Sequence, residues 1–177
     1  DNSIVDFEKD NLGNLWIAGF RYGITKYNLK TGQFRQYKRL SSDSTETYGT
    51  PCIYKDNQGT LWIGTAGRGL AKYLPQKDTF QLFYPDPLKA TDGSKRAENN
   101  VTGITEDKND KNILWLSCLD GLYSFNKTTN VFIYHPFIYP GDKIKNVNYF
   151  LCIEQLGNYL YLGTWYEGLV IFDKTTK

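Results

Sequence analysis

The sequence predicts an all-β fold of β-propeller blades, each a four-stranded antiparallel meander, with about four blades in an incomplete ring. Two observations predict it. A unit of about 46 to 53 residues recurs four times along the 177-residue chain, and every copy contains only strand and turn signals. Helical repeats of this length would show an apolar rhythm of 3.6 residues, which the sequence lacks.

The repeat is defined by landmarks that keep step with one another. An aromatic residue stands in the second strand of each copy, a glycine opens the third strand, and another aromatic residue follows it. These landmarks are Trp16, Trp62, Trp115 and Tyr161; Gly23, Gly69, Gly121 and Gly168; and Tyr27, Tyr73, Phe125 and Phe172. Their agreement over four copies is hard to obtain by chance.

The clearest copy, from Asp56 to Tyr73, predicts a strand, a tight connection and a second strand. Its first strand contains Leu61, Trp62 and Ile63 in succession. A strand tolerates consecutive apolar residues only when both of its faces are buried. A propeller provides this burial because each blade is covered by the blade before it and the blade after it. We therefore expect Trp62 to lie in the core.

The repeats divide the chain into four expected blades. Their approximate bounds are residues 1–46, 47–98, 99–146 and 147–177, and the last blade lacks its outer strand. A closed propeller removes exposed sheet edges and usually has four to eight blades. We therefore expect the open ends to be covered, either by the remaining blades of a longer protein or by a second copy in a homodimer.

Composition excludes several classes of function. The 21 basic and 19 acidic residues are interspersed and give a net charge of +2, whereas nucleic-acid binding would need basic residues gathered on one face. No apolar run is long enough for a transmembrane helix, and the start shows no signal-peptide pattern. Cys52, Cys118 and Cys152 form no metal-binding or redox motif. We expect neither a metal nor another cofactor.

The predicted meander places its connections at two ends of each blade. The turns at one end are short, whereas the connections at the other end are long or rich in aromatic and charged residues. The candidate ligand-binding residues in these richer connections are Arg21, Tyr22, Arg68, Asp120, Trp165, Tyr166 and Glu167. Aromatic rings can stack on the apolar face of a sugar, and charged groups can hydrogen-bond its hydroxyls or a uronate. The alternative is that these side chains only contact neighbouring blades.

The sequence offers little for catalysis. Nucleophilic catalysis would need an activating base, and the single histidine, His135, is expected at the outer edge of the third blade in contact with solvent. The inner strands offer Asp6, Cys52, Gly103 and Cys152 at one level, which is a sparse set for a propeller lyase or hydrolase. We therefore expect this segment not to be an enzyme.

Several motifs together resemble the two-component regulator propeller repeat. They are a turn followed by Gly-x-Leu-Trp-Ile-Gly-Thr, then Gly-Leu, then Tyr-Asn or Phe-Asp, then Thr-Gly-x-Phe-x-x-Tyr. The first copy carries them in Gly13 to Gly19, Tyr27-Asn28 and Thr31 to Tyr37, and the second most fully in Gly59 to Tyr73. The fourth copy departs from the pattern, with Tyr161 in place of tryptophan.

This resemblance implies a function. In that family the repeats form the extracytoplasmic sensor regions of hybrid histidine kinases, typically in gut Bacteroidetes, which detect glycans and control polysaccharide-utilisation genes. It therefore implies a periplasmic segment of an inner-membrane protein, with a histidine kinase domain elsewhere in the full-length chain. It also implies an oligosaccharide ligand or a partner propeller domain. A protein-interaction scaffold without a ligand of its own stays open as the alternative.

Overall fold

The computed structural model describes residues 3–20, 23–38, 40, 49–85, 99–136 and 149–176. Within these residues the chain forms β-strands joined by turns. Most of the long connections expected between blades lie outside the described residues. No helix in the described part of the chain is long and apolar enough to cross a membrane.

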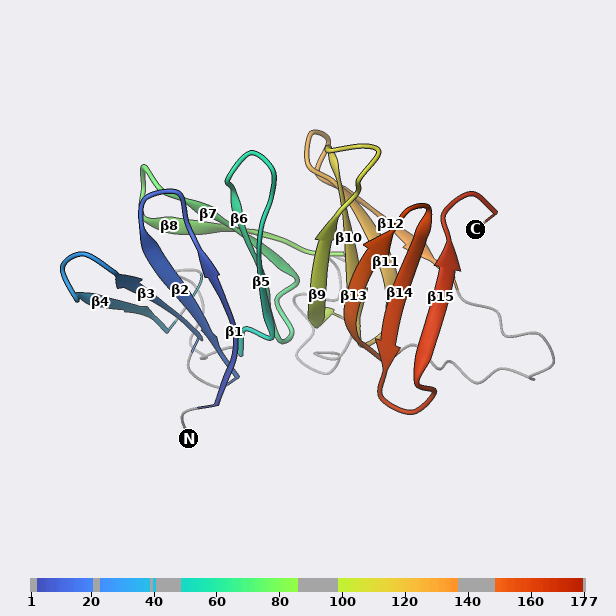
Figure 1. The fold of residues 1–177 in the computed structure, drawn as a ribbon, viewed down its shortest axis with the longest axis horizontal. Helices are drawn as coiled ribbons and strands as arrows, with labels where there is room; N and C mark the ends of the chain where they lie inside the picture. The colour runs from blue at the N-terminus through green and yellow to red at the C-terminus, as the bar shows by residue number, and fades with distance from the viewer. Residues whose placement is uncertain are drawn as a thin grey trace.

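The strands form four antiparallel sheets in chain order, which we call blades 1 to 4 (Figure 1). Blade 1 contains β1 (Ile4–Lys9), β2 (Asn14–Gly19), β3 (Gly23–Asn28) and β4 (Phe34–Tyr37). Blade 2 contains β5 (Cys52–Lys55), β6 (Leu61–Gly64), β7 (Leu70–Leu74) and β8 (Thr79–Phe83). Blade 3 contains β9 (Val101–Glu106), β10 (Ile113–Cys118), β11 (Gly121–Asn126) and β12 (Val131–His135). Blade 4 contains β13 (Phe150–Leu156), β14 (Tyr159–Thr164) and β15 (Leu169–Asp173).

Each sheet is a meander, because its strands pair in the order of the sequence. The first strand of each blade lies against the first strand of the next, so that β1, β5, β9 and β13 follow one another along the inside of an arc (Figure 1). The predicted fold class, an all-β propeller of four meander blades, is therefore confirmed.

The hydrophobic core lies between the blades and is divided into three clusters, one for each junction. Trp16, Trp62 and Trp115 each lie in one of these clusters and are almost fully buried. All four residues of β6 are buried, as the apolar run around Trp62 predicts. In blades 1 to 3 the second strand therefore supplies the largest side chain of the junction with the next blade.

A carboxylate in the turn before the second strand accepts a hydrogen bond from the tryptophan of that strand in blades 1 to 3. The pairs are Asp10–Trp16, Asp56–Trp62 and Asp107–Trp115, with Nε1 to Oδ2 distances of 2.9, 2.9 and 2.6 Å. The strand register places Leu156 and Tyr161 at these two positions of blade 4. A buried indole N–H needs an acceptor, which the turn supplies in the first three blades.

The environment of His135 differs from the prediction. We expected a solvated residue at an outer edge, but His135 is only 8% exposed. Its Nε2 lies 2.9 Å from Ser124 Oγ, and its ring lies 4.8 Å from the ring of Trp115. The prediction was wrong because His135, the last residue of the otherwise largely exposed β12, packs its ring against Phe172 of blade 4 at 5.7 Å.

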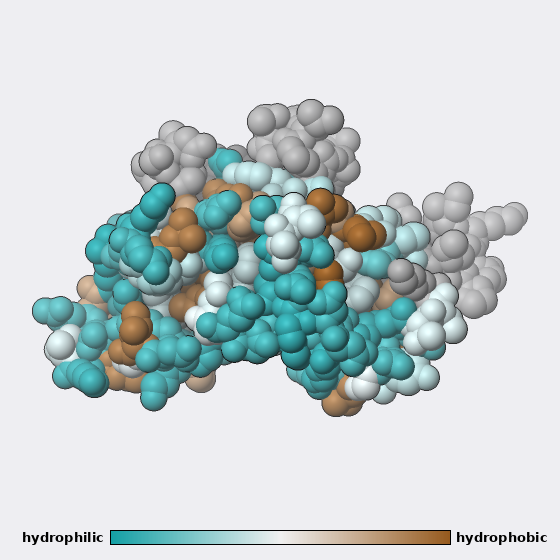
Figure 2. Space-filling model, turned by 90° about the horizontal axis from the view of Figure 1, so that it is seen from above, coloured by the Kyte–Doolittle hydropathy of each residue, from teal (hydrophilic) through white to brown (hydrophobic). Residues whose placement is uncertain are grey.

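The short turns within the strand pairs β1–β2, β5–β6, β9–β10 and β13–β14 all lie at the same end of their blades, uppermost in Figure 1. This end, which we call the tight-turn end, is mostly hydrophilic with separate hydrophobic patches when seen from above (Figure 2). The connections from the second to the third strand of each blade lie at the opposite end. The predicted ligand-binding residues that the structure describes belong to this second end; they are Arg68, Asp120, Trp165, Tyr166 and Glu167.

Candidate ligand-binding site

One backbone hydrogen bond recurs at the end opposite the tight turns. In every blade a residue one or two positions after the second strand donates its N–H to the carbonyl of a residue one to three positions before the first strand. The donor and acceptor pairs are Phe20–Ser3, Ala66–Gly49, Leu119–Asn100 and Trp165–Tyr149, with N to O distances of 3.0, 2.9, 3.2 and 3.0 Å. Blade 4 is the blade that places an aromatic side chain at both positions.

The turn that carries Trp165 is fixed by its neighbours. Thr164 donates its N–H to the carbonyl of Gly168 at 2.8 Å, and its hydroxyl accepts the N–H of Glu167 at 2.7 Å. Gly168 has a φ of 76°, in the left-handed region that glycine adopts at little cost. The backbone of the turn is therefore held in one shape, and Trp165, Tyr166 and Glu167 project from it.

The same turn occurs in blade 2. Thr65 donates its N–H to the Gly69 carbonyl at 3.1 Å, its hydroxyl accepts the N–H of Arg68 at 3.0 Å, and Gly69 has a φ of 71°. Arg68 and Glu167 thus occupy equivalent positions in one turn design. The two blades differ in what the turn displays, since blade 2 has Ala66 where blade 4 has an indole.

Tyr149, Trp165 and Tyr166 form an exposed cluster that we call the aromatic platform. Their side chains are 45%, 63% and 75% exposed. The ring of Tyr166 lies 6.4 Å from that of Trp165, at an interplanar angle of 49°, and 6.4 Å from that of Tyr149, at 84°. These three large rings meet in one place without being buried, and the exposed carboxylate of Glu167 follows directly in the chain.

The aromatic platform presents apolar ring faces and hydrogen-bonding groups together. Tyrosine and tryptophan offer large contact areas with few rotatable bonds, so that little conformational entropy is lost when they bind. The phenol and indole groups and the Glu167 carboxylate can accept or donate hydrogen bonds at the edge of a stacked ligand. This combination suits a ligand with one apolar face and a polar rim.

Of the other predicted site residues, Arg21 and Tyr22 lie outside the described residues. Arg68 and Asp120 lie in the equivalent turns of blades 2 and 3, both half-buried. The hydroxyl of Tyr123 donates to Asp120 Oδ2 at 2.9 Å, and burial together with the charge of Asp120 raises the pKa of Tyr123. The structure therefore gathers Trp165, Tyr166 and Glu167 in one turn.

Tyr149 is the member of the platform that sequence reasoning missed. It stands directly before β13, where the other blades have Ser3, Gly49 and Asn100. A long connection without repeat landmarks precedes it, so that it looked like an ordinary loop residue. Aligning the start of each inner strand with the end of each second strand would have paired it with Trp165.

The four inner strands surround a cavity of about 300 Å³ on the axis of the arc, which we call the axial pocket. Its polar groups are engaged in the fold: Asp6 Oδ2 accepts the N–H of Ile53 at 2.9 Å, and Thr102 Oγ1 donates to the Phe150 carbonyl at 2.7 Å. Burial, followed by the charge of Asp6, raises the pKa of the Cys52 thiol. A protonated thiol is a poor nucleophile.

The three cysteines are free, and Cys152 is the exposed one. Among the described residues, no group of three or more His, Cys, Asp or Glu side chains is arranged to hold a metal ion. In the part of the chain that the structure describes, the axial pocket therefore offers no metal centre, and its buried thiol, Cys52, is not activated.

Fold and site together define a propeller segment with an exposed aromatic platform on its fourth blade. Residues 46–67 match the family model described as two component regulator propeller, which confirms the resemblance predicted from the repeat motifs. No curated protein matches the sequence.

Solved structures share the fold over nearly the whole chain. A structure described as the extracellular domain of a hybrid two component system, BT3049 from B. thetaiotaomicron, has a TM-score of 0.77 and 23% identity over 99% of this chain and 24% of that one. The extracellular domain described under BT4673 from the same organism gives 0.68 and 18%, over 99% and 24%. The RRP9 WD40 repeats give 0.64 and 11%, over 98% and 52%. The chain spans about a quarter of the length of the first two, and at these identities the likeness concerns the fold.

Proposed function

We propose that this chain is the ligand-sensing propeller segment of an extracytoplasmic sensor in a hybrid two-component system, and that it binds an oligosaccharide at the aromatic platform. The observation that carries the proposal is the cluster of Tyr149, Trp165 and Tyr166, three large rings that meet in one place and stay exposed, whereas the tryptophans of the second strands of blades 1 to 3 are buried in the junctions. The family match and the extracellular origin of the similar structures support the role and the location.

Carbohydrate chemistry fits the aromatic platform better than other small-ligand chemistry does. A pyranose ring has a face of C–H groups that packs on an aromatic ring and an equatorial rim of hydroxyls that hydrogen-bond. Trp165 and Tyr166 supply the ring faces, and Glu167 supplies an acceptor for hydroxyl donors. Two rings inclined to one another can contact successive sugar units of a chain.

Sensing in this proposal requires no chemical step. The turn that carries Trp165 is bonded to the Tyr149 carbonyl, and the next residue, Phe150, is fully buried at the start of β13. A ligand that fixes the turn therefore acts directly on the inner strand of blade 4. A ligand that binds one conformation of the turn and inner strand more tightly than another shifts the equilibrium toward the conformation that it prefers.

The rest of the proposal concerns the full-length protein. We propose that the remaining blades precede or follow this segment, that the protein is anchored in the inner membrane, and that a histidine kinase domain lies elsewhere in it. The alternative, a protein-interaction scaffold with no ligand of its own, predicts that the aromatic platform binds a protein surface and no glycan.

Isothermal calorimetry against a panel of plant and host oligosaccharides, neutral and uronate-containing, tests the proposal. We expect saturable binding that weakens at least tenfold, or about 1.4 kcal/mol, in Trp165→Ala and in Tyr149→Ala. The matched control is Tyr159→Ala, which removes a tyrosine that is 45% exposed at the other end of β14. Equal binding by all three variants would place the ligand elsewhere, and no binding by the folded chain would favour the scaffold.

A further inference from the structure

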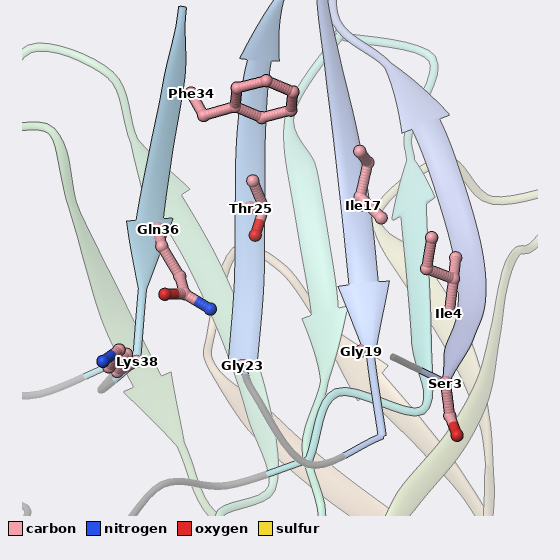
Figure 3. Close-up of a pocket in the computed structure, with 9 residues that line it drawn as sticks. All are labelled: Ser3, Ile4, Ile17, Gly19, Gly23, Thr25, Phe34, Gln36 and Lys38. Carbon is pink, nitrogen blue, oxygen red and sulfur yellow. The ribbon is translucent and has the colours of Figure 1, made fainter. Parts of the chain in front are cut away.

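Blade 1 has a hollow on either side of it. The hollow on the side away from blade 2 has a volume of about 700 Å³, and Figure 3 shows Phe34, Thr25 and Ile17 side by side across β4, β3 and β2, where they line it. It carries apolar side chains like those of a blade junction, and in the full-length protein proposed above it suits an adjoining blade. The second hollow, of about 430 Å³, lies between blades 1 and 2 at the tight-turn end, and we call it the junction groove.

The junction groove runs between turns of the two blades. Blade 1 contributes residues 10–12, and blade 2 contributes residues 58–61 and 72–76. The exposed amide side chains that line it are those of Asn11, Gln58 and Gln76. Amide oxygens accept hydrogen bonds, so the groove offers acceptors to a ligand that carries N–H or O–H groups.

Asp10 gives the junction groove a negative charge. Its carboxylate is 8% exposed and accepts four hydrogen bonds from neutral donors, which are the N–H groups of Leu12 and Asn14, the Asn14 amide and the Trp16 indole. Burial would raise the pKa of Asp10, but the bonds from Asn14 and Trp16 outweigh it and hold that pKa below its usual value. The carboxylate therefore stays ionised, and no lysine or arginine of the described residues forms an ion pair with it.

Two lysines close to the junction groove have other partners. Lys72 lines the groove, but its ammonium group lies 5.4 Å from the centre of the Trp62 ring, which belongs to the core between blades 2 and 3. Lys26 of blade 1 donates to the Tyr73 hydroxyl at 3.0 Å and pairs with Asp78 at 3.8 Å. Neither ammonium group neutralises the carboxylate in the groove.

The equivalent carboxylates of blades 2 and 3 each bind an ammonium group. Lys127 Nζ lies 3.0 Å from Asp56 Oδ2, and Lys174 Nζ lies 2.7 Å from Asp107 Oδ2. In both cases the lysine belongs to the following blade and stands directly after its third strand. The strand register places Pro75 at this position of blade 2, and Pro75 lines the junction groove. The groove is therefore open where the other two junctions have a lysine.

An amide takes the place of the ammonium group at the first carboxylate. Asn14 Nδ2 donates to Asp10 Oδ2 at 2.8 Å, and Asn14 Oδ1 accepts a hydrogen bond from Asn28 at 3.1 Å. The amide completes the hydrogen bonds of the carboxylate but adds no charge. A buried anion is stabilised most when a cation accompanies it, as at the other two junctions. An ammonium group that enters the junction groove supplies that cation.

We propose that the junction groove binds a protonated primary amine, whose ammonium group lies at Asp10 as Lys127 and Lys174 lie at the other two carboxylates. The amine belongs either to a small molecule or to a lysine side chain of a partner protein, and its chemistry at the groove is the same. Leu12, which is 70% exposed, and Pro75 line the groove and give the alkyl stem of the amine an apolar contact. A bound amine contacts both blades and closes the first junction from outside.

Heteronuclear magnetic resonance of the isotope-labelled chain tests this site, because the Trp16 indole N–H donates to the same oxygen of Asp10 at 2.9 Å. The probe is Nα-acetyl-lysine methylamide, and its Nε-acetylated form, which has no charge, is the control. We expect the probe to shift the Trp16 indole signal saturably, with the indole signals of Trp62 and Trp115 unmoved and no shift from the control. A Trp16 signal that stays in place at millimolar probe, or that moves equally with the control, would overturn the proposal.

Two substitutions test the same site from the protein side. Asp10→Asn keeps the shape of the side chain but removes its charge, and it should weaken probe binding at least tenfold. Pro75→Lys places an ammonium group on the chain itself, as at the other two junctions, and should abolish the shift caused by the probe. Asp110→Asn is the control, since Asp110 is an exposed carboxylate in the equivalent turn of blade 3. Circular dichroism verifies that each variant is folded, and probe binding that survives Pro75→Lys would overturn the proposal.

A longer probe distinguishes the two sources of the amine. The peptide acetyl-Leu-Lys-Leu-amide offers the same ammonium group between two apolar side chains. Binding at least tenfold tighter than that of the single-residue probe would assign the groove to a lysine of a partner protein, and equal binding would assign it to a small amine. The aromatic platform lies at the opposite end of the blades, so neither probe should change the Trp165 signal, and the outcome is independent of sugar binding.

Discussion

The junction between blades 1 and 2 and the junction between blades 2 and 3 use the same turn carboxylate with different partners. Between blades 2 and 3, Asp56 accepts a hydrogen bond at 3.0 Å from Lys127 of blade 3, which also donates to Glu106 at 2.8 Å. We call this contact, in which a lysine after the third strand donates to the turn carboxylate of the preceding blade, the lysine clasp; Lys174 and Asp107 form it between blades 3 and 4. Between blades 1 and 2, Asp10 receives an amide from its own blade, Asn14, at 2.8 Å. Pro75 of blade 2 occupies the position that Lys127 occupies in blade 3, and its side chain carries no charge.

Burial and hydrogen bonding oppose each other in the lysine clasp. Burial alone would raise the pKa of Asp56, but hydrogen bonds from Trp62 and Lys127 outweigh it and hold that pKa below its usual value. Burial would lower the pKa of Lys127, but its bonds to Glu106 and Asp56 raise it instead. The charged forms are therefore kept in place although the side chains are 9% exposed or less.

The first junction is closed further out, by Asp78 in the turn after β7. The hydroxyls of Tyr37 and Tyr73 each donate to Asp78 Oδ1 at 2.6 Å, and Arg35 forms an ion pair with Oδ2. The comparison teaches that the Asp–Trp pair is constant in blades 1 to 3, whereas the contact that links one blade to the next differs between the first junction and the second.

The largest effect on stability is expected from a change in the Asp–Trp pair. Trp62→Ala should lower the free energy of unfolding by about 3 to 5 kcal/mol, because it empties a buried junction and leaves Asp56 without its indole donor. Trp165→Ala, on the aromatic platform, should change it by less than about 0.5 kcal/mol. Urea unfolding measures both. Similar losses for the two variants would contradict the assignment of core and surface.

A smaller effect is expected from the lysine clasp. Lys127→Met should cost about 3 kcal/mol, because it leaves Asp56 and Glu106 buried without their shared cation. Lys30→Met, in the exposed turn after β3, is the control and should be nearly neutral. Equal stabilities of these two variants in urea would show that the lysine clasp does not hold the junction.

The smallest effect is expected at the first junction, and it depends on pH. Burial, then the hydrogen bond to Asp78, raises the pKa of Tyr37 to about 12. Its unfolded value is about 10, so its contribution is complete below pH 10 and is lost as the pH rises toward 12. Tyr37→Phe should cost about 1 kcal/mol near neutral pH. The difference in unfolding free energy between variant and wild type should shrink above pH 10. Urea unfolding from pH 7 to 11 measures it, and a difference that stays constant over this range would contradict the prediction.

The fold was predictable from the sequence because its landmarks are periodic. Trp16, Trp62 and Trp115 recur in step, and burial at the same position follows from the repeat. The lysine clasp was not predictable in this way. Lys127 and Asp56 are 71 residues apart and belong to different repeats, so their contact depends on how two blades pack.

The candidate site was partly predictable for the same reason. Trp165, Tyr166 and Glu167 follow a landmark strand and could be singled out as a group. Tyr149 was missed because it joins the aromatic platform through a backbone bond between two strand ends and not through a repeat landmark. His135 was misjudged because its burial depends on Phe172 of the following blade.

Intrinsic tryptophan fluorescence tests the central claim most directly, because Trp165 is 63% exposed whereas Trp16, Trp62 and Trp115 are 6% exposed or less. Acrylamide should therefore quench Trp165 selectively in the free protein. Titration with an oligosaccharide that binds should shift the emission of Trp165 to the blue and protect it from quenching, and Trp165→Ala should abolish both changes. Calorimetric binding of a sugar without any change in Trp165 fluorescence would contradict the assignment of the aromatic platform as the ligand-binding site.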